Sequence, residues 1–388
     1  MLTKNIIFKN FKLNKNNKNN KKIRNELKLL LKEENAIIQS LGPTYKNNYN
    51  KKTISKLKNF SLIRIIGMGG AILGTKSIYH FLKHKIKKSF TFIDNLSPNI
   101  NLQNNKKKLL NLIVSKSGNT LETISNVNIL IKNKNKNVFI TEDKKSYISS
   151  LANSLKDEII HHNNFIGGRF SVLSEVGMLP AELMGLNVKS FKQINNLIKN
   201  KIFINTLINN VSCTINFVKK NKANSIILNY DEKSHNLFKW YQQLVAESLG
   251  KKGNGILPII STMPKDNHSV MQLYLDGNKS NFFTFFYVHE KNSPKINERK
   301  ILPSHNYLLN KSIDQIILSQ KLATEKVFAN KNLPFRSFEI LNRDEKTLGE
   351  LFCFFILETI LVGRVLNVNP YDQPSVELIK QETKKILL

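Results

Sequence analysis

One segment of this sequence has the residue types and spacing needed to bind an anion. Ser115–Thr123, Ser-Lys-Ser-Gly-Asn-Thr-Leu-Glu-Thr, follows an apolar run and precedes a predicted helix. Hydroxyl groups and unpaired amide N–H groups at the start of a helix attract negative charge. Asn119 and Glu122 also have the spacing of a capping box. The segment therefore predicts either an anion-binding turn or a capped turn that binds nothing.

A glycine-rich turn, Gly67–Gly74, also follows a predicted strand and opens a predicted helix. Glycine lets the backbone approach a ligand closely. The dinucleotide fingerprint would need a glycine where Ile72 stands, although Asp94 would suit its acidic partner. A P-loop would need lysine directly after Gly74, where Thr75 stands. The turn therefore predicts close approach either to a ligand, a nucleotide included, or to neighbouring backbone.

Two further segments could supply a cation and a general base. Gly167 and Gly168 precede Arg169, so little side chain would separate that guanidinium from a ligand. Gln243 and Glu247 are four residues apart in a predicted helix and share one face of it. A partly buried glutamate there would suit a general base. The alternatives are an exposed loop arginine and an exposed helix glutamate.

Two isolated residues complete the set that could transfer protons. His268, close to Asp266, could carry a proton, but a lone histidine is also a common packing residue. Lys380 lies about two turns into a predicted C-terminal helix, where a solvated lysine is the alternative. No group of histidine, cysteine and carboxylate residues has the spacing of metal ligands, so we predict no metal site.

Alternating strands and helices must position these residues. Short β-rich runs separated by helical stretches are typical of βαβ units and parallel sheets. We therefore predict an α/β fold whose ligands bind at the carboxyl ends of the strands. The predicted strands are 63–66, 90–93, 110–114, 138–141 and 158–161, followed by 225–229, 256–260 and 282–288. The predicted division is an N-terminal polar, helical segment 1–58, domains 59–200 and 201–370, and a C-terminal helix 371–388 packed across both domains.

The composition narrows the class of protein. The 388 residues are 41% hydrophobic, which allows a substantial core, yet no run approaches the roughly 20 apolar residues of a membrane span. The N-terminus has no signal-peptide pattern, and two cysteines in apolar surroundings predict buried free thiols in a cytoplasmic protein. The net charge of +32 comes from lysines scattered among asparagines, without a zinc-finger or RNP motif. We therefore expect neither a membrane nor a specific nucleic-acid partner.

Taken in order, the segments resemble the motifs of the glucose-6-phosphate isomerase (phosphoglucose isomerase) family. The resemblance extends from Gly67 to Lys380. It rests on Ser-Lys-Ser-Gly-x-Thr-x-Glu-Thr, Gly-Gly-Arg-Phe-Ser-Val-Leu-Ser, Ala-Glu-Ser-Leu-Gly-Lys, Asp-x-His-Ser, and Asn-Pro-Tyr-Asp-Gln-Pro with a lysine seven residues beyond the glutamine. It implies two sugar-isomerase (SIS, flavodoxin-like) domains with parallel sheets flanked by helices. The implied activity is reversible isomerisation of glucose 6-phosphate to fructose 6-phosphate without a cofactor.

The resemblance also implies a role for each matching residue. It makes Glu247 the base that moves a proton between C1 and C2 of the open-chain sugar, and Arg169 the group that stabilises the enediolate. It assigns ring opening to Lys380 and to a His268 supplied by the second subunit of a homodimer. The implied phosphate ligands are Ser115, Lys116, Ser117 and Thr120, and the implied substrate-positioning residues are Gly70, Gly168, Gln243 and Gln373.

The sequence departs from the family pattern at three positions. Ala71 stands where serine is usual, so one sugar or phosphate contact is lost or taken over by water. Ser375 and Ile379 replace usual glycines and put the reach of Lys380 in question. Two rival functions stay open: a bifunctional phosphoglucose/phosphomannose isomerase, and a sugar-phosphate-binding regulator without catalysis.

Overall fold

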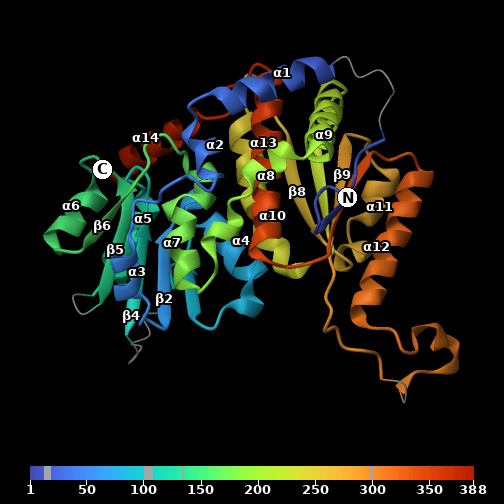
Figure 1. The fold of residues 1–388 in the computed structure, drawn as a ribbon, viewed down its shortest axis with the longest axis horizontal. Helices are drawn as coiled ribbons and strands as arrows, with labels where there is room; N and C mark the ends of the chain where they lie inside the picture. The colour runs from blue at the N-terminus through green and yellow to red at the C-terminus, as the bar shows by residue number, and fades with distance from the viewer. Residues whose placement is uncertain (13–18, 100–107, 133–134, 298–299) are drawn as a thin grey trace.

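Two separate β-sheets organise the molecule (Figure 1). The computed structural model describes residues 1–12, 19–99, 108–132, 135–297 and 300–388. The first sheet has the order β3-β2-β4-β5-β6, and all its neighbouring strands are parallel. Its strands are β2 (Leu62–Gly67), β3 (Ser89–Ile93), β4 (Leu109–Val114), β5 (Lys136–Glu142) and β6 (Glu158–His162).

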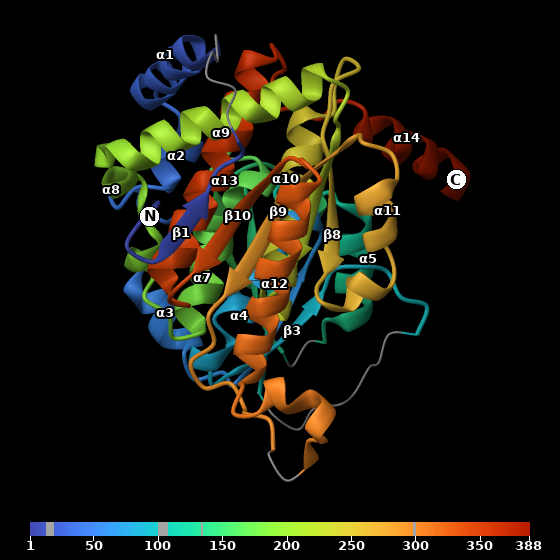
Figure 2. The same ribbon diagram turned by 90° about the vertical axis from the view of Figure 1, so that its right-hand side faces the viewer.

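The second sheet has the order β1-β10-β9-β7-β8, and only β1 runs antiparallel to its neighbour (Figure 2). Both sheets have helices on their faces, which is why strands such as Leu109–Val114 read as nearly continuous apolar runs. The predicted α/β class with parallel sheets flanked by helices is confirmed. The strands of this sheet are β1 (Ile6–Lys9), β7 (Asn224–Asn229), β8 (Leu257–Thr262), β9 (Asn281–Val288) and β10 (Phe335–Ile340).

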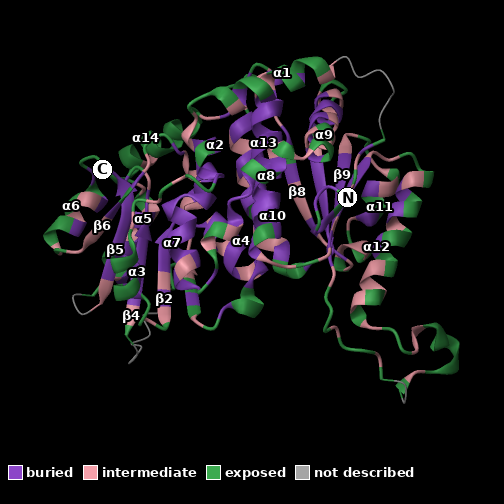
Figure 3. Ribbon diagram, viewed as in Figure 1, coloured by how far each residue is buried: buried purple, intermediate pink, exposed green. Residues whose placement is uncertain are grey.

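Three helices fill the space between the sheets: α4 (Leu73–Phe81), α10 (His235–Leu249) and α13 (Glu345–Val365) (Figure 1). Helix α10 packs against both α4 and α13 and against β8. Helix α13 is buried along nearly its whole length (Figure 3). Its sequence is mostly apolar, as expected of a helix without a solvent face, with buried glutamates such as Glu358 as exceptions. These helices form the rigid base on which the site is built.

The remaining helices pack around the two sheets and around the three helices between them. Helices α11 and α12 lie on the outer side of the second sheet (Figure 2). The full set of remaining helices is α1 (Asn19–Lys32), α2 (Ala36–Ser40), α3 (Lys51–Leu57), α5 (Leu121–Leu130), α6 (Tyr147–Ser154), α7 (Glu175–Leu183), α8 (Ile194–Lys199), α9 (Lys201–Lys219), α11 (Met271–Asp276), α12 (Ile313–Asn330) and α14 (Val376–Leu387).

The two ends of the chain differ from the sequence-based prediction. Segment 1–58 is not wholly helical, because Ile6–Lys9 forms β1 and pairs with β10; residues 13–18 of that segment lie outside the described residues. The C-terminal helix begins at Val376, after the turns that follow Pro370, and not at residue 371. It also contains no buried residue, so it does not pack across the two domains as predicted.

Two smaller predictions can be compared with the structure directly. Cys213 and Cys353 are both buried and free, as predicted. Within the described part of the chain, no helix has the length and apolar character needed to cross a bilayer.

Strand order decides where the first sheet can bind a ligand. Strand β2 pairs with β3 on one side and β4 on the other, so the connections after β2 and β4 leave the sheet in opposite directions. Such a switch point opens a crevice at the carboxyl ends of the two strands. The glycine-rich turn follows β2 and the Ser115–Thr123 segment follows β4, so both anion-binding candidates border this crevice.

Candidate active site

A cavity of about 390 Å³ lies at the carboxyl edge of the first sheet. It is bordered by the segments after β2, β4, β5 and β6, by one face of α10 and by the start of α14. Of the residues that the sequence singled out for a role, it brings together Gly70, Ser115, Lys116, Ser117, Thr120, Gly168, Arg169, Gln243, Glu247, Gln373 and Lys380.

The loop after β4 has the features of an anion site. Ser115 is buried, and its Oγ lies 3.1 Å from Oγ1 of Thr120. Gly118 turns the chain with a φ of +66°, a conformation that residues with a Cβ rarely adopt. Helix α5 begins at Leu121, and the Thr120 side chain makes no capping hydrogen bond. The first amide groups of α5 are therefore not capped by the residue before them, which suits an anionic ligand.

The predicted capping box in this loop is wrong. Asn119 lies one residue before the N-cap position, so its spacing to Glu122 does not match the box. Its Oδ1 instead accepts a hydrogen bond of 2.9 Å from the backbone N–H of Tyr147, at the start of α6. Asn119 therefore ties the loop to the next helix and leaves the start of α5 open.

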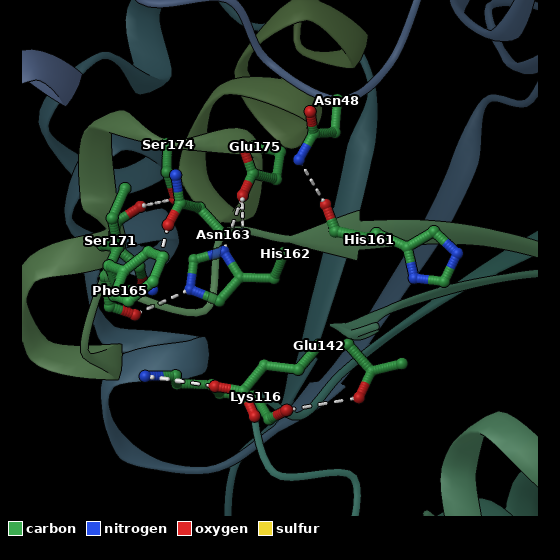
Figure 4. A network of polar contacts seen from close by, with 12 residues as sticks. Asn48, Lys116, Glu142, His161, His162, Asn163, Phe165, Ser171, Ser174 and Glu175 are labelled. Carbon is green, nitrogen blue, oxygen red and sulfur yellow. Dashed lines mark hydrogen bonds and ion pairs between the residues drawn. The ribbon is translucent and has the colours of Figure 1, made fainter. Parts of the chain in front are cut away.

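A carboxylate with two lysine partners flanks this loop. Glu142, at the end of β5, is buried, and its carboxylate lies 3.2 Å from Nζ of Lys116 (Figure 4) and 2.5 Å from Nζ of Lys144. Burial raises the pKa of Glu142, but the hydrogen bonds and charges of Lys144 and Lys116 outweigh it and hold that pKa below its ordinary value. The cluster carries one net positive charge and faces the cavity, which favours a phosphate there.

Gly70 lets the turn after β2 meet the turn after β6 closely. A Cβ on Gly70 would lie 2.2 Å from the carbonyl carbon of Gly168 and 2.4 Å from the amide nitrogen of Arg169. Only glycine fits there, because backbone atoms cannot move aside. Both glycines line the cavity, so their close contact fixes the position of Arg169 beside it.

Arg169 uses all its donors to join three parts of the chain. Its Nε donates to Oγ of Ser248 at 2.9 Å, and its Nη1 donates to Oε2 of Glu247 at 3.1 Å and to Oε1 of Gln373 at 2.7 Å. Its Nη2 donates to the carbonyl oxygens of Pro370 at 2.7 Å and Asp372 at 3.0 Å. The guanidinium therefore holds α10 and the C-terminal segment against the first domain.

The charge of Arg169 is only partly compensated. Burial lowers the pKa of Arg169, and the carboxylates of Glu247 and Asp372, which act in the opposite direction, do not restore it. The side chain is 2% exposed, so water supplies little of the missing stabilisation. A further negative charge in the cavity would therefore interact favourably with this guanidinium.

Glu247 is held between two partners and stays accessible from the cavity. Its Oε1 accepts a hydrogen bond of 2.9 Å from Nε2 of Gln243, and its Oε2 accepts the one from Arg169. About a third of its side chain is exposed. Oε1 of Gln243 is buried without a hydrogen-bond partner among the described residues, so it can accept a bond from a ligand hydroxyl. The pair therefore offers a fixed base and a free acceptor on one helix face.

The C-terminal helix brings Lys380 to the rim of the cavity. Lys380 is exposed, and its Nζ lies 2.6 Å from Oε1 of Glu377 on the same helix. Ile379, one of the departures from the family pattern, points into solvent and is 70% exposed. Ser375 precedes the helix and makes no capping bond through its side chain.

His268 is not part of this cavity. It is the last residue of a 3₁₀ turn, Lys265–His268, that follows β8 in the second sheet, and its side chain is exposed. Asp266 of that turn accepts a hydrogen bond of 2.8 Å from the backbone N–H of Thr262, which fixes the turn on β8. The chain alone therefore does not bring His268 to the other predicted residues.

Three residues of the site were not singled out from the sequence. Ser248, which accepts a hydrogen bond from Arg169, directly follows Glu247 in the sequence. Its place next to the predicted base is the feature that could have drawn attention to it. Glu142 and Lys144 follow the predicted strand 138–141, and the carboxyl-edge rule could have selected them. All three hold or flank a residue that the sequence did select.

Comparison with known proteins agrees with this geometry. The family model described as phosphoglucose isomerase matches residues 21–388. The glucose-6-phosphate isomerase of Methanocaldococcus jannaschii is 32% identical over 385 residues, which cover 92% of this chain and 90% of that protein. The glucose-6-phosphate isomerase of Mycoplasmopsis pulmonis is 31% identical and covers 88% of each chain.

Solved structures share the fold. A hypothetical protein from Thermus thermophilus superposes with a TM-score of 0.81 at 22% identity, over 95% of this chain and 94% of that one. A glucose-6-phosphate isomerase from Chlamydia trachomatis superposes with a TM-score of 0.69 at 20% identity, over 87% and 71% of the two chains. The match of the family model over nearly the whole length places this chain in the phosphoglucose isomerase family.

Proposed function

We propose that this protein interconverts glucose 6-phosphate and fructose 6-phosphate through a cis-enediol(ate), as an enzyme of glycolysis and gluconeogenesis in the cytoplasm. The observation that carries the proposal is the position of Glu247, held by Gln243 and Arg169 in a cavity that also contains the Ser115–Thr120 loop. One cavity thus offers a base, a cation and an anion site, which are the groups that an aldose–ketose isomerisation of a phosphorylated sugar requires.

The phosphate is the handle that orients the sugar. Ser115, Ser117 and Thr120 supply hydroxyl groups, and the start of α5 supplies amide groups. Lys116 adds positive charge beside them. Binding energy from this remote group holds the reacting carbons near the base, which raises the rate of the chemical step.

The proton transfer is assigned to Glu247. In the open-chain aldose its carboxylate removes the proton from C2, while the C1 oxygen gains a proton, which yields the enediol(ate). The same carboxyl group then returns a proton to C1 while the C2 hydroxyl loses its proton, which gives the ketose. Arg169 stabilises the negative charge on the enediolate oxygen, because its own charge is incompletely compensated by protein carboxylates.

Ring opening is assigned to Lys380 and to a His268 from the partner subunit of a homodimer. Lys380 lies at the cavity rim, whereas His268 is exposed on the second domain of its own chain. A second copy could present the histidine to the cavity, and the exposed 3₁₀ turn leaves it available for that contact.

The function is tested with purified protein and fructose 6-phosphate in deuterated water. We expect glucose 6-phosphate that carries deuterium at C2, because a base-mediated transfer exchanges the proton with solvent. A folded protein that binds the sugar phosphate without turnover would instead be the non-catalytic regulator. Comparable turnover of mannose 6-phosphate would make it the bifunctional enzyme.

The shared site is tested by mixing two inactive variants. Equal amounts of the Glu247→Gln and His268→Gln variants are unfolded together and refolded. Random association then makes about half of all dimers heterodimers with one subunit of each variant. If His268 acts across the interface, each mixed dimer has one intact site, and about a quarter of wild-type activity returns. A mixture that stays inactive, while refolded wild type recovers, would place His268 in its own subunit's site.

A further inference from the structure

A buried histidine lies directly behind the segment that presents Arg169. His162 is the last residue of β6, and its side chain is 1% exposed. Its Nδ1 lies 2.6 Å from Oε1 of Glu175, and its Nε2 lies 2.9 Å from the carbonyl oxygen of Ile166 (Figure 4). Neither the proposed chemistry nor the family motifs use this residue.

Both partners of the His162 ring are hydrogen-bond acceptors. Oε1 of Glu175 also accepts from the backbone N–H of Asn163, and its Oε2 accepts from the Tyr45 hydroxyl. Burial raises the pKa of Glu175, but the hydrogen bond and charge of His162 outweigh it and hold that pKa below its ordinary value. A backbone carbonyl cannot donate, so Nε2 must carry the hydrogen of the contact with Ile166. With Glu175 ionised, Nδ1 must carry a hydrogen as well, and the ring is then an imidazolium.

Other charged groups face this pair from the surrounding elements. Glu142 is the register partner of His162 on β5 and is itself paired with lysines. Lys192, after the turn that precedes α8, lies over the Tyr45 ring and is attracted by Glu175, while burial lowers its pKa to about 8. Tyr49 donates a further hydrogen bond of 3.1 Å to Glu182, which lies two turns after Glu175 on α7. Among these groups His162 is the one that contacts the 163–168 segment and Glu175 together.

The segment fixed in this way leads into the site. Ile166 is fully buried, whereas Phe165 beside it is 84% exposed. The carbonyl that His162 contacts is thus the internal anchor of a loop that is otherwise open to solvent. Gly168 and Arg169 follow within three residues, and their backbone is the part that meets Gly70.

We propose that His162 is a positioning residue, whose imidazolium joins Glu175 to the Ile166 carbonyl and so holds Arg169 in its catalytic place. Loss of a ring proton leaves two acceptors facing each other, which loosens the 163–168 segment. The effect on turnover rests on the proposed function, whereas the protonation of His162 does not.

The first test compares His162→Gln with His161→Gln. His161 is the next residue on the same strand but is half exposed, with its ring 3.5 Å from Asp143, so it is a matched control. We expect His162→Gln to lower kcat about tenfold, because displacing a catalytic group by a fraction of an ångström has effects of that order. KM for fructose 6-phosphate stays near the wild-type value, because the phosphate loop after β4 is untouched.

Equal losses in both variants, or a rise in KM with unchanged kcat, would overturn the positioning role. Glu175→Gln provides a second variant, because its amide oxygen can still accept from the ring but its negative charge is gone. We expect it to reduce kcat in the same way, again with KM near the wild-type value.

The second test needs no turnover and uses the wild-type protein. Nitrogen-15 labelling of the eight histidines and comparison with the His162→Gln spectrum identifies the His162 signals. We expect both ring nitrogens to have imidazolium shifts at neutral pH. A neutral ring at that pH would overturn the proposal even if the enzyme is active, and an imidazolium in an inactive protein would count only against the proposed function.

Discussion

Two arginine–glutamate pairs contact α10, and their surroundings differ. Arg336 and Glu358 form a pair whose side chains are 1% and 4% exposed, and the Tyr241 hydroxyl from α10 lies beside both. Burial lowers the pKa of Arg336, but the attraction of Glu358 and Tyr241 outweighs it and the pKa is raised. In the Arg169–Glu247 pair burial prevails and the pKa of the arginine is lowered.

This difference in burial and in hydrogen-bond partners shows which of the two pairs a substrate can reach. The Arg336 pair is closed, because Thr284, Asn210 and Tyr241 satisfy the donors that Glu358 leaves. The Glu247 carboxylate keeps about a third of its side chain accessible from a cavity. The same two residue types therefore stabilise the fold in one place and face a substrate site in the other. Each prediction below changes one member of a pair and asks whether stability or turnover responds.

The largest effect is expected from Glu247→Gln. The amide keeps the shape but cannot take up a proton, so kcat should fall by about 10⁴-fold, the upper range for loss of a general base. The melting temperature and the affinity for substrate should stay close to wild type. A coupled assay and a thermal scan measure both; near-normal turnover would remove the assignment of this base.

The matching change in the closed pair is Glu358→Gln. It leaves the buried Arg336 without its counter-charge and should lower the free energy of unfolding by about 3–5 kcal/mol in urea titrations. Turnover of the fraction that stays folded should be near wild type. If this variant lost activity without losing stability, the division between the two pairs would be wrong.

A smaller effect is expected from Arg169→Lys. Lysine keeps the charge but cannot hold Ser248, Glu247 and the Pro370 carbonyl together, so kcat should fall about a hundredfold, as for the loss of one transition-state donor. Arg336→Lys is the control, and it should reduce stability much more than turnover. Parallel kinetic and unfolding measurements separate the two outcomes.

The smallest effect is expected from Lys144→Gln beside the phosphate loop. The Lys144 side chain is half exposed in its ion pair with Glu142, so water screens its charge and the effect should be small. Removing this charge should raise KM about threefold and leave kcat unchanged. Lys385→Gln makes the same change in net charge at an exposed ion pair on α14. An identical rise in KM for both variants would show that only total charge matters.

The regular part of the fold could be predicted from sequence. Strands such as Leu109–Val114 are buried on both faces and therefore carry an unbroken apolar signal. Strand β10 was missed because Phe335–Ile340 contains Arg336 and Glu339, and only the distant Glu358 explains a buried arginine there. Strand β1 was missed because four residues among lysines give no periodic pattern.

The candidate site was predictable where a motif supplied both residue type and local structure. The loop after β4 and the Gln243–Glu247 face depend on contacts within one segment, so their signal is local. The partners of Arg169 come from α10 and from the segment 370–373, and no spacing in the sequence indicates such long-range contacts. The capping box failed for a related reason, since Tyr147 competes for the Asn119 side chain.

The pairing of β1 with β10 has a consequence for the order in which the protein assembles during synthesis. Every strand of the first sheet has been synthesised once His162 is made, so that sheet can form while the rest of the chain is translated. Ile6 is made before all of that sheet, yet it must wait for Ile340 before its edge of the second sheet closes. Until then the N-terminal residues are an unpaired strand, and chaperones that bind nascent chains have their longest access to this part of the molecule.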